Sequence, residues 1–352
     1  MMEVTERIIL GVVTGGNPYA EKLLQTLDKS QRYSKIVVIC PKLNPIPIRN
    51  MITVKQAVGS PYYSVLRDHK VDVLVYLGDV GCSSLKEEGE EPNETPIALV
   101  KTLIEACENS DINHLIYVSS ACVYSPDKTS WRTLSEEDLE LSIPERECDE
   151  LIAEKLIQDY IFENPQIDMA ILRTATVLGP SSDNDQIHES NFWRRISFVN
   201  SFPVQFTHEY DFIESIICSL INRASGIFNI ASRGVVAPGE IAEIIGRKNW
   251  YLPKIFPFIV TALIVRALTF HRLKYYEWSF LKYPTVLSTS KSAVMLGFVP
   301  GFSSSEAVVD YLYSSEVKGM NVEITNAEQP ETLDTEQVIL SKIPRFLKKK
   351  RN

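Results

Sequence analysis

The segment His114-Leu-Ile-Tyr-Val-Ser-Ser-Ala-Cys-Val-Tyr124 says more about the fold than any other part of the chain. It begins as a continuous apolar run, which is typical of a parallel strand that is buried on both faces. The run passes directly into the paired serines Ser119 and Ser120, and Val123-Tyr124 follows three residues after the second serine. The segment therefore predicts a buried strand that ends in hydroxyl side chains.

Other apolar runs surround this strand, and helical patterns alternate with them. Runs that predict further strands occupy residues 8–13, 35–39, 71–77 and 169–173. Apolar residues recur at helical spacing between them, as at Ala20, Leu23, Leu24 and Leu27. Strands that alternate with helices need crossover connections, so the sequence predicts an α/β fold with a doubly wound, Rossmann-like parallel sheet.

Composition and charge exclude several classes of protein. The 352 residues are 45% hydrophobic and 23% charged, as in ordinary globular proteins. The net charge of -9 argues against nucleic acid as a partner, because phosphate neutralisation needs a dense basic face. The six cysteines form no C-x-x-C pair, so neither a metal site nor a disulfide framework is expected. An acidic start without a signal peptide predicts a cytoplasmic protein.

The strand that ends at Ser120, with Val123-Tyr124 after it, resembles the active-site strand of the extended short-chain dehydrogenase/reductases. This is the NAD-dependent epimerase/dehydratase family. Four later segments are also similar to family segments: 169–180, 205–211, 226–231 and 296–300. The resemblance covers roughly residues 7–314. It implies oxidoreductase, epimerase or dehydratase activity on a nucleotide sugar or a related alcohol.

The resemblance also implies a domain organisation. Residues 1–180 would form the Rossmann-like NAD(P)-binding domain, and residues 181–315 a small C-terminal substrate lobe. The polar stretch 316–352, with its basic end, is predicted to be a disordered tail, since it offers too little apolar surface to offset ordering entropy.

The cofactor loop departs from the family pattern Thr-Gly-x-x-Gly-x-x-Gly. Here it reads Thr14-Gly-Gly-Asn-Pro-Tyr-Ala-Glu21, with Pro18 and Glu21 at the second and third glycine positions. Proline removes a backbone donor, and a carboxylate in the first helical turn competes with a phosphate for the positive helix end.

The resemblance implies NAD or NADP as the cofactor. The second strand is not followed by an acid that would bind the adenosine ribose, and Lys42 suits the 2′-phosphate of NADP. The implied cofactor residues are Thr14, Gly15, Gly16, Asn17, Lys42, Gly78, Ser119, Thr174 and Val177.

The catalytic positions depart further. Ser120 matches the family serine that hydrogen-bonds the substrate hydroxyl. When Ala153-Glu-Lys-Leu is used as the anchor, Arg146 and Glu150 stand where the family has the tyrosine and lysine of Tyr-x-x-x-Lys. A guanidinium cannot shuttle protons near neutral pH, and Glu150 reverses the charge beside the ribose. A literal Tyr-x-x-x-Lys at 124–128 contains a proline, which opposes a helix, so it is interpreted as a decoy.

Two functions therefore stay open. The first is a family enzyme whose activity is weak or lost, and the second is a non-catalytic dinucleotide-binding, regulatory or scaffold protein. The apolar segment 255–270 and the basic, aromatic stretch after it can be interpreted in two ways. They predict either a helix packed in the lobe or against a homodimer partner, or peripheral membrane contact through residues 255–282. The segment is too short to span a bilayer, which needs about 20 residues.

Overall fold

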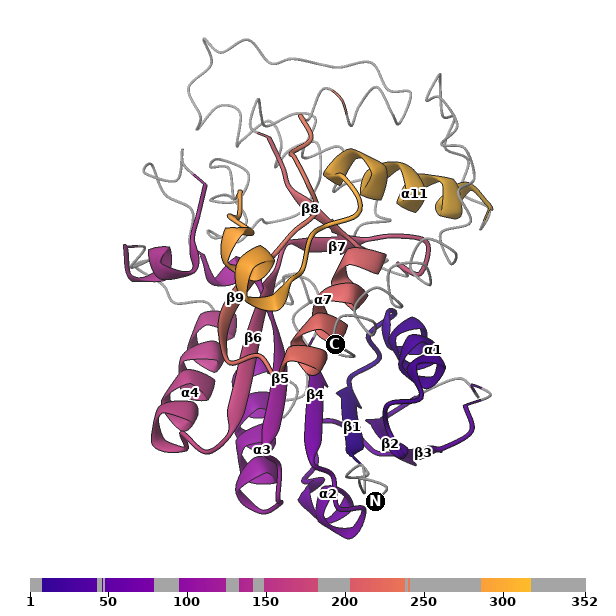
Figure 1. Ribbon diagram of the computed structural model, residues 1–352, viewed down its shortest axis with the longest axis vertical. Helices are drawn as coiled ribbons and strands as arrows, with labels where there is room; N and C mark the ends of the chain where they lie inside the picture. The colour runs from indigo at the N-terminus through magenta and orange to yellow at the C-terminus, as the bar shows by residue number, and fades with distance from the viewer. Residues whose placement is uncertain are drawn as a thin grey trace, which may run out of the picture.

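The protein is an α/β protein built on one seven-stranded parallel sheet, as the computed structural model shows (Figure 1). The structure describes residues 8–42, 46, 48–78, 95–124, 133–141, 149–182, 203–237, 240 and 286–317. The strand order is β3-β2-β1-β4-β5-β6-β9. The predicted doubly wound, Rossmann-like sheet is therefore confirmed.

The strands of this sheet are short and mostly buried. Their bounds are β1 (Ile9–Thr14), β2 (Lys35–Cys40), β3 (Met51–Lys55), β4 (Val73–Leu77), β5 (His114–Ser120), β6 (Asp168–Thr174) and β9 (Gly226–Ile230). A separate pair of parallel strands is formed by β7 (Thr176–Leu178) and β8 (Phe206–His208). Strand β3 was not predicted, because it lies at the sheet edge and its residues are largely exposed rather than a continuous apolar run.

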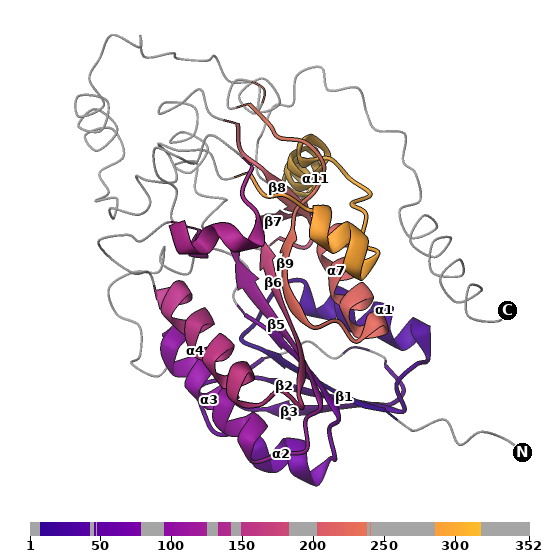
Figure 2. The ribbon, with the colours of Figure 1, turned by 60° about the vertical axis from the view of Figure 1, so that its left-hand side comes forward.

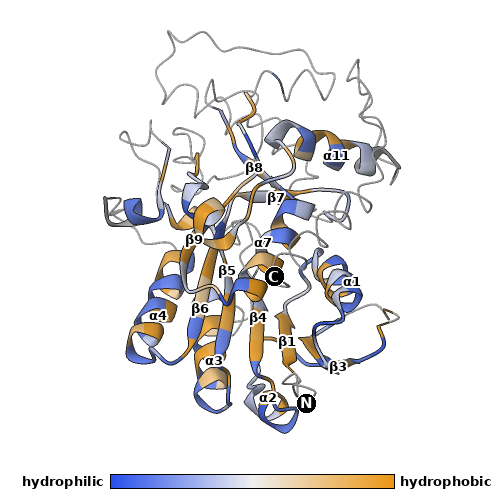
Figure 3. Cartoon of the chain, in the orientation of Figure 1, coloured by the Kyte–Doolittle hydropathy of each residue, from blue (hydrophilic) through white to orange (hydrophobic). Residues whose placement is uncertain are grey.

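The helices are α1 (Ala20–Ser30), α2 (Tyr63–Asp68), α3 (Pro96–Glu108), α4 (Asp149–Glu163), α7 (Glu209–Asn222) and α11 (Ser304–Val317). The last of them, α11, packs against β7 and β8, and the other five cover the two faces of the main sheet. Helices α1 and α7 pack on one face, and α2, α3 and α4 pack on the other (Figure 2). The central strands are strongly hydrophobic, whereas most helices have a hydrophobic and a hydrophilic side (Figure 3). This is the pattern expected for a sheet buried between two helical layers.

The sheet has its topological switch point between β1 and β4. From β1 the chain moves outward through β2 to β3, and it then returns to place β4, β5, β6 and β9 on the opposite side. In open α/β sheets, ligands bind in the crevice outside the carboxyl ends of the strands at such a point. The fold thus predicts where a ligand would lie before any side chain is considered.

The main sheet is not confined to the first 180 residues. Strand β9 pairs with β6, and α7 contributes Phe212 and Ile216 to the core that also holds α1. The division into 1–180 and 181–315 stays a prediction. Residues 255–282 and the tail from 318 onward lie outside the described residues. Within the described part, no helix is long and apolar enough to cross a membrane.

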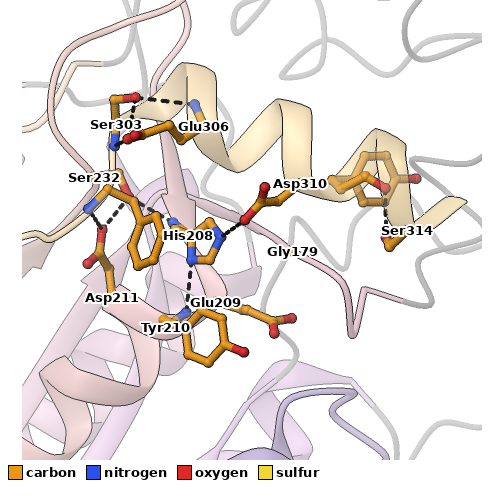
Figure 4. A network of polar contacts seen from close by, with 12 residues as sticks. Gly179, His208, Glu209, Tyr210, Asp211, Ser232, Ser303, Glu306, Asp310 and Ser314 are labelled. Atoms are coloured by element: carbon orange, nitrogen blue, oxygen red, sulfur yellow. Dashed lines mark hydrogen bonds and ion pairs between the residues drawn. The ribbon is translucent and has the colours of Figure 1, made fainter. Parts of the chain in front are cut away.

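A capping box begins α11: the Ser303 amide donates to Glu306 Oε2 at 2.6 Å, and the Glu306 amide donates to Ser303 Oγ at 3.2 Å (Figure 4). Of the cysteines, Cys40, Cys107 and Cys218 are buried free thiols, as expected. Cys122 instead is disulfide-bonded, which the sequence did not predict.

Candidate functional site

The loop between β1 and α1 is closed by its own hydrogen bonds. Thr14 Oγ1 accepts from the amides of Gly16 at 3.3 Å and Asn17 at 3.0 Å. The Tyr19 amide donates to Asn17 Oδ1 at 3.0 Å, and the Ala20 amide donates to the Asn17 carbonyl at 3.1 Å. Gly16 has a φ of +111°, a conformation that favours glycine. Four backbone donors near the helix start are therefore already used within the loop.

The Asn17 side chain bridges the switch point. Its Nδ2 donates to the Gly78 carbonyl at 3.0 Å, just beyond the carboxyl end of β4. Because Asn17 follows β1 and Gly78 follows the neighbouring strand β4, this single bond crosses the crevice where a dinucleotide would lie. The structure therefore brings together Thr14, Gly15, Gly16, Asn17 and Gly78, all of which the sequence assigned to the cofactor.

Tyr19 joins this loop to the segment after β6. Its hydroxyl donates to the Val177 carbonyl at 2.8 Å and lies 2.8 Å from Ser182 Oγ. Burial raises the pKa of this phenol far above its ordinary value, so it stays protonated. Tyr19 was not among the predicted site residues. The structure shows that its side chain is buried and packs inside the loop region.

The serines at the end of β5 have local partners. Ser120 Oγ accepts from the Cys122 amide at 3.2 Å and so caps the 3₁₀ turn Ala121–Val123. Ser119 Oγ donates to Glu154 Oε2 at 2.6 Å, and Thr174 Oγ1 donates to the Ser119 carbonyl at 3.1 Å. Ser119, Ser120 and Thr174 thus lie together at the carboxyl ends of β5 and β6.

A buried ion pair fixes α4 against this part of the sheet. Arg173, on β6, donates to Glu154 Oε1 from Nε at 2.9 Å and from Nη2 at 2.6 Å. Both side chains are almost fully buried. Glu154 also accepts from Ser119, so one carboxylate on α4 holds both β5 and β6. Glu154 was part of the sequence anchor at 153–156 but was not predicted as a positioning residue.

Tyr124 belongs to the same network. Its hydroxyl donates to Asn229 Oδ1 at 2.6 Å and accepts from Arg173 Nη1 at 2.9 Å. Burial raises the pKa of Tyr124 to about 12, although the neighbouring Arg173 opposes this shift. The phenol is therefore engaged with β6 and β9 and remains protonated.

Glu150 lies in the first turn of α4, four residues before Glu154. Residues four apart share one helix face, and both carboxylates contribute to the raised pKa of Tyr117 on β5, although burial is the larger cause. Glu150 is thus on the side of α4 that faces the sheet. Arg146, the other substituted position, lies outside the described residues.

Lys42 lies beyond the carboxyl end of β2, the strand next to β1. It is an exposed residue two positions beyond the end of β2. The described residues contain no group of three or more His, Cys, Asp or Glu side chains arranged to hold a metal ion.

A second polar network joins α7 to α11, as Figure 4 shows. His208 Nδ1 accepts from the Tyr210 amide at 3.2 Å, and Nε2 lies 3.1 Å from Asp310 Oδ2. The imidazole stacks on Phe302, with 3.8 Å between ring centroids. Asp211 accepts from Ser232 Oγ at 2.7 Å, and burial raises its pKa. These contacts hold the chain where it enters α7.

A family model, described as NAD dependent epimerase/dehydratase family, matches residues 20–201. This match spans more than half of the chain. The chain belongs to the NAD-dependent epimerase/dehydratase family. Family membership accounts for the order of the strands in the main sheet.

Individual relatives are distant. Uncharacterized proteins of Mycobacterium tuberculosis and Mycobacterium bovis are 24% identical over 271 residues, which is 73% of this chain and 70% of theirs. A UDP-glucuronic acid 4-epimerase from Bacillus cereus, solved with UDP-glucuronic acid and NAD, is 20% identical, with a TM-score of 0.61. Coverage is 88% of this chain and 100% of that one.

A second family structure is the Bordetella bronchiseptica enzyme WbmH, solved with NAD+. It is 14% identical, with a TM-score of 0.62, and covers 89% of this chain and 99% of its own. At these identities the solved structures establish the shared fold.

Proposed function

We propose that this family member binds a nicotinamide dinucleotide at the β1–β4 crevice and has weak or no activity on alcohols. Support for binding comes from the family and from relatives solved with NAD. By analogy, the substrate class is a nucleotide sugar, since one such relative was solved with UDP-glucuronic acid.

The observation that carries the loss of activity is the register of α4. Glu154 is held by Arg173 and Ser119 at 2.6–2.9 Å, so the helix cannot slide along β5 without breaking a buried ion pair. With Glu154 fixed, Glu150 occupies the position one turn earlier on the same face. Counted from the sequence anchor Ala153-Glu-Lys-Leu, Glu150 is the residue at the lysine position of the family pattern.

Charge reversal at this position opposes the family chemistry. A lysine ammonium lowers the pKa of a neighbouring phenol and favours its role as a proton shuttle. A carboxylate raises the pKa of a nearby phenol and also repels a hydroxyl that is losing its proton. Arg146, at the tyrosine position, keeps its proton near neutral pH and so cannot act as a proton shuttle. Ser120 alone can orient a hydroxyl but cannot complete the relay.

The loop geometry supports weak rather than tight binding. Pro18 has no amide hydrogen, and the amides of Gly16, Asn17, Tyr19 and Ala20 already have acceptors within the loop. A pyrophosphate must either displace these bonds or be held by the few donors that remain at the start of α1.

The alternative is an active enzyme in which Glu150 is an unconventional acid or base. Its half-buried position on the sheet-facing side of α4 favours this reading over that of a solvated helix start. A regulatory or scaffold role, peripheral membrane contact through residues 255–282, a homodimer and a cytoplasmic location all remain predictions.

Calorimetry with NADH and NADPH, combined with a turnover assay, tests the proposal. The turnover assay follows the reduced cofactor and product formation with UDP-glucose and UDP-glucuronic acid. Binding of either cofactor without turnover supports the proposal. Turnover that is lost in Glu150→Gln but kept in Glu163→Gln, at the far end of α4, supports the alternative. Absence of binding by both cofactors overturns both.

A further inference from the structure

The chain carries a long segment without a single carboxylate. Between Asp28 and Asp68 there is no Asp or Glu, although the whole protein has a net charge of -9. The same segment holds seven basic residues: Lys29, Arg32, Lys35, Lys42, Arg49, Lys55 and Arg67. It forms the end of α1, strands β2 and β3, and α2. Every charged side chain between these two aspartates, including all those of β2 and β3, is therefore basic.

Two of these lysines lie at the ligand-binding edge of the sheet. Lys55 ends β3 and is the register partner of Cys40, which ends β2. The ladder continues one step further, since the Gln56 amide donates to the Cys40 carbonyl at 2.9 Å. Lys42 follows Cys40 by two residues, and both lysines are exposed.

Cys40 provides independent evidence that Lys55 lies close to this point. Burial raises the pKa of the Cys40 thiol, and the positive charge of Lys55 opposes that shift. Strands in a sheet are about 4.8 Å apart, so the Lys55 ammonium reaches the end of β2 without any movement of the backbone.

The end of β2 decides which dinucleotide a Rossmann sheet prefers. An acidic residue at this point hydrogen-bonds the 2′-hydroxyl of the adenosine ribose and repels a 2′-phosphate, whereas a basic residue accommodates the phosphate. Here a thiol takes the place of the carboxylate. Lys55 is its register partner, Lys42 follows it by two residues, and neither strand carries an acid.

We propose that Lys42 and Lys55 form a 2′-phosphate subsite, so that this chain binds NADP in preference to NAD. The inference rests on the proposed function, because it requires a dinucleotide at the β1–β4 crevice. Lysine binds phosphate as a point charge rather than by a bidentate fork, so two lysines on adjacent strand ends can share one phosphate without exact geometry. The remaining basic residues lie elsewhere, as Arg49 does in the turn before β3.

Calorimetry with NADP+ and NAD+ on the full chain tests the subsite. We expect NADP+ to bind about tenfold more tightly, given that each exposed charge pair contributes a factor of several. The preference should fall as NaCl is raised, because salt screens exposed charges. Adenosine 2′,5′-bisphosphate should bind more tightly than 5′-AMP, which lacks only the 2′-phosphate.

Lys42→Gln and Lys55→Gln should each reduce the preference about threefold, and together they should abolish it while leaving NAD+ affinity unchanged. Arg49→Gln removes the same charge from the opposite edge of the same strands and should leave the preference intact.

Equal binding of NAD+ and NADP+ would overturn the subsite and leave the proposed function standing. No binding of either dinucleotide would overturn both. A preference that Arg49→Gln reduces as much as Lys55→Gln would show a general surface effect and overturn the assignment.

Discussion

The buried ion pair of Arg173 and Glu154 fixes α4 against the main sheet. Each charge is costly to bury, and the cost is offset only while both partners and their hydrogen bonds are present. Glu154 also accepts from Ser119, and Arg173 also donates to Tyr124. Loss of one partner would leave an uncompensated charge between α4, β5 and β6.

Glu154→Ala should therefore destabilise the protein by about 3–5 kcal/mol, the usual cost of breaking a buried pair from one side. Urea denaturation would measure the change. Glu163→Ala removes a carboxylate from the exposed end of the same helix, and it should change the free energy of unfolding by less than about 0.5 kcal/mol. A cost for Glu154→Ala as small as that of the control would show that the pair does not fix α4.

His114 should make the stability depend on pH. Its side chain is buried, and its Nε2 has no hydrogen-bond partner among the residues that the structure describes. Burial, reinforced by the charge of Arg223, lowers the pKa of His114 from 6.5 to about 4. Because the imidazole is harder to protonate in the folded chain than in the unfolded one, its contribution to stability is complete above pH 6.5 and is lost as the pH falls towards 4.

Between pH 7 and pH 4.5 this loss should amount to about 2 kcal/mol, at about 1.4 kcal/mol for each pKa unit. Denaturant unfolding of the parent chain and of His114→Gln at both pH values would isolate it from the titration of the carboxylates. The variant should lose less stability on acidification than the parent. Equal losses in the two proteins would contradict the assignment.

Among the helices and strands, the sequence predicts best those elements that one local pattern of residues is enough to identify. Continuous apolar runs identified β1, β2, β4, β5 and β6, because a strand buried on both faces has no polar positions. The edge strand β3 has no buried residue and gave no such run. The register of α4 was predicted from one short anchor and is consistent with the contacts of Glu154.

The contacts that close the candidate site were not predictable in the same way. The Asn17–Gly78 bond and the Tyr19–Val177 bond join residues 61 and 158 positions apart. No local pattern encodes such pairs, since they depend on how β1, β4 and β7 are placed by the whole fold. The sequence indicated which residues gather at the crevice but not that they bond to one another across it.

An added methyl group should affect the stability of the protein differently at two glycines, Gly179 and Gly15. At Gly179 the new Cβ would lie 2.4 Å from Glu209 Cγ, and Glu209 is itself fully buried. Gly179→Ala should therefore cost about 1–3 kcal/mol of stability through overpacking. At Gly15 no atom lies within 4 Å of the new Cβ, so the stability of Gly15→Ala should change by less than about 0.5 kcal/mol.

The same Gly15→Ala substitution should weaken dinucleotide binding about tenfold or more, because the glycine permits close approach of the pyrophosphate to the backbone. Thermal unfolding and calorimetry on both variants would separate the two effects. Unchanged cofactor affinity in Gly15→Ala would indicate that the loop only connects β1 to α1 and that the proposed ligand site is wrong.

For the molecule as a whole, the main sheet and its core draw on both halves of the chain. The helical layer over one face combines α1 with α7, and the last strand, β9, pairs with β6. Eight large apolar side chains beyond residue 182 belong to this core: Phe212, Ile213, Ile216, Leu220, Phe228, Ile230, Leu296 and Phe298. Each contributes about 1.5–3 kcal/mol when fully buried. Their combined contribution is comparable with or larger than the entire stability of a typical domain, about 5–15 kcal/mol.

A fragment that ends at residue 182 should therefore not unfold cooperatively, even though it contains the glycine loop, α4 and six of the seven sheet strands. A fragment that ends at residue 317, after α11, keeps all eight core side chains and should unfold in a single transition. Near-ultraviolet circular dichroism and urea denaturation of the two fragments would test this. A cooperative transition in the shorter fragment would mean that the first 180 residues form an independent domain, as the sequence predicted, and that α7 and β9 are additions to a core that is stable without them.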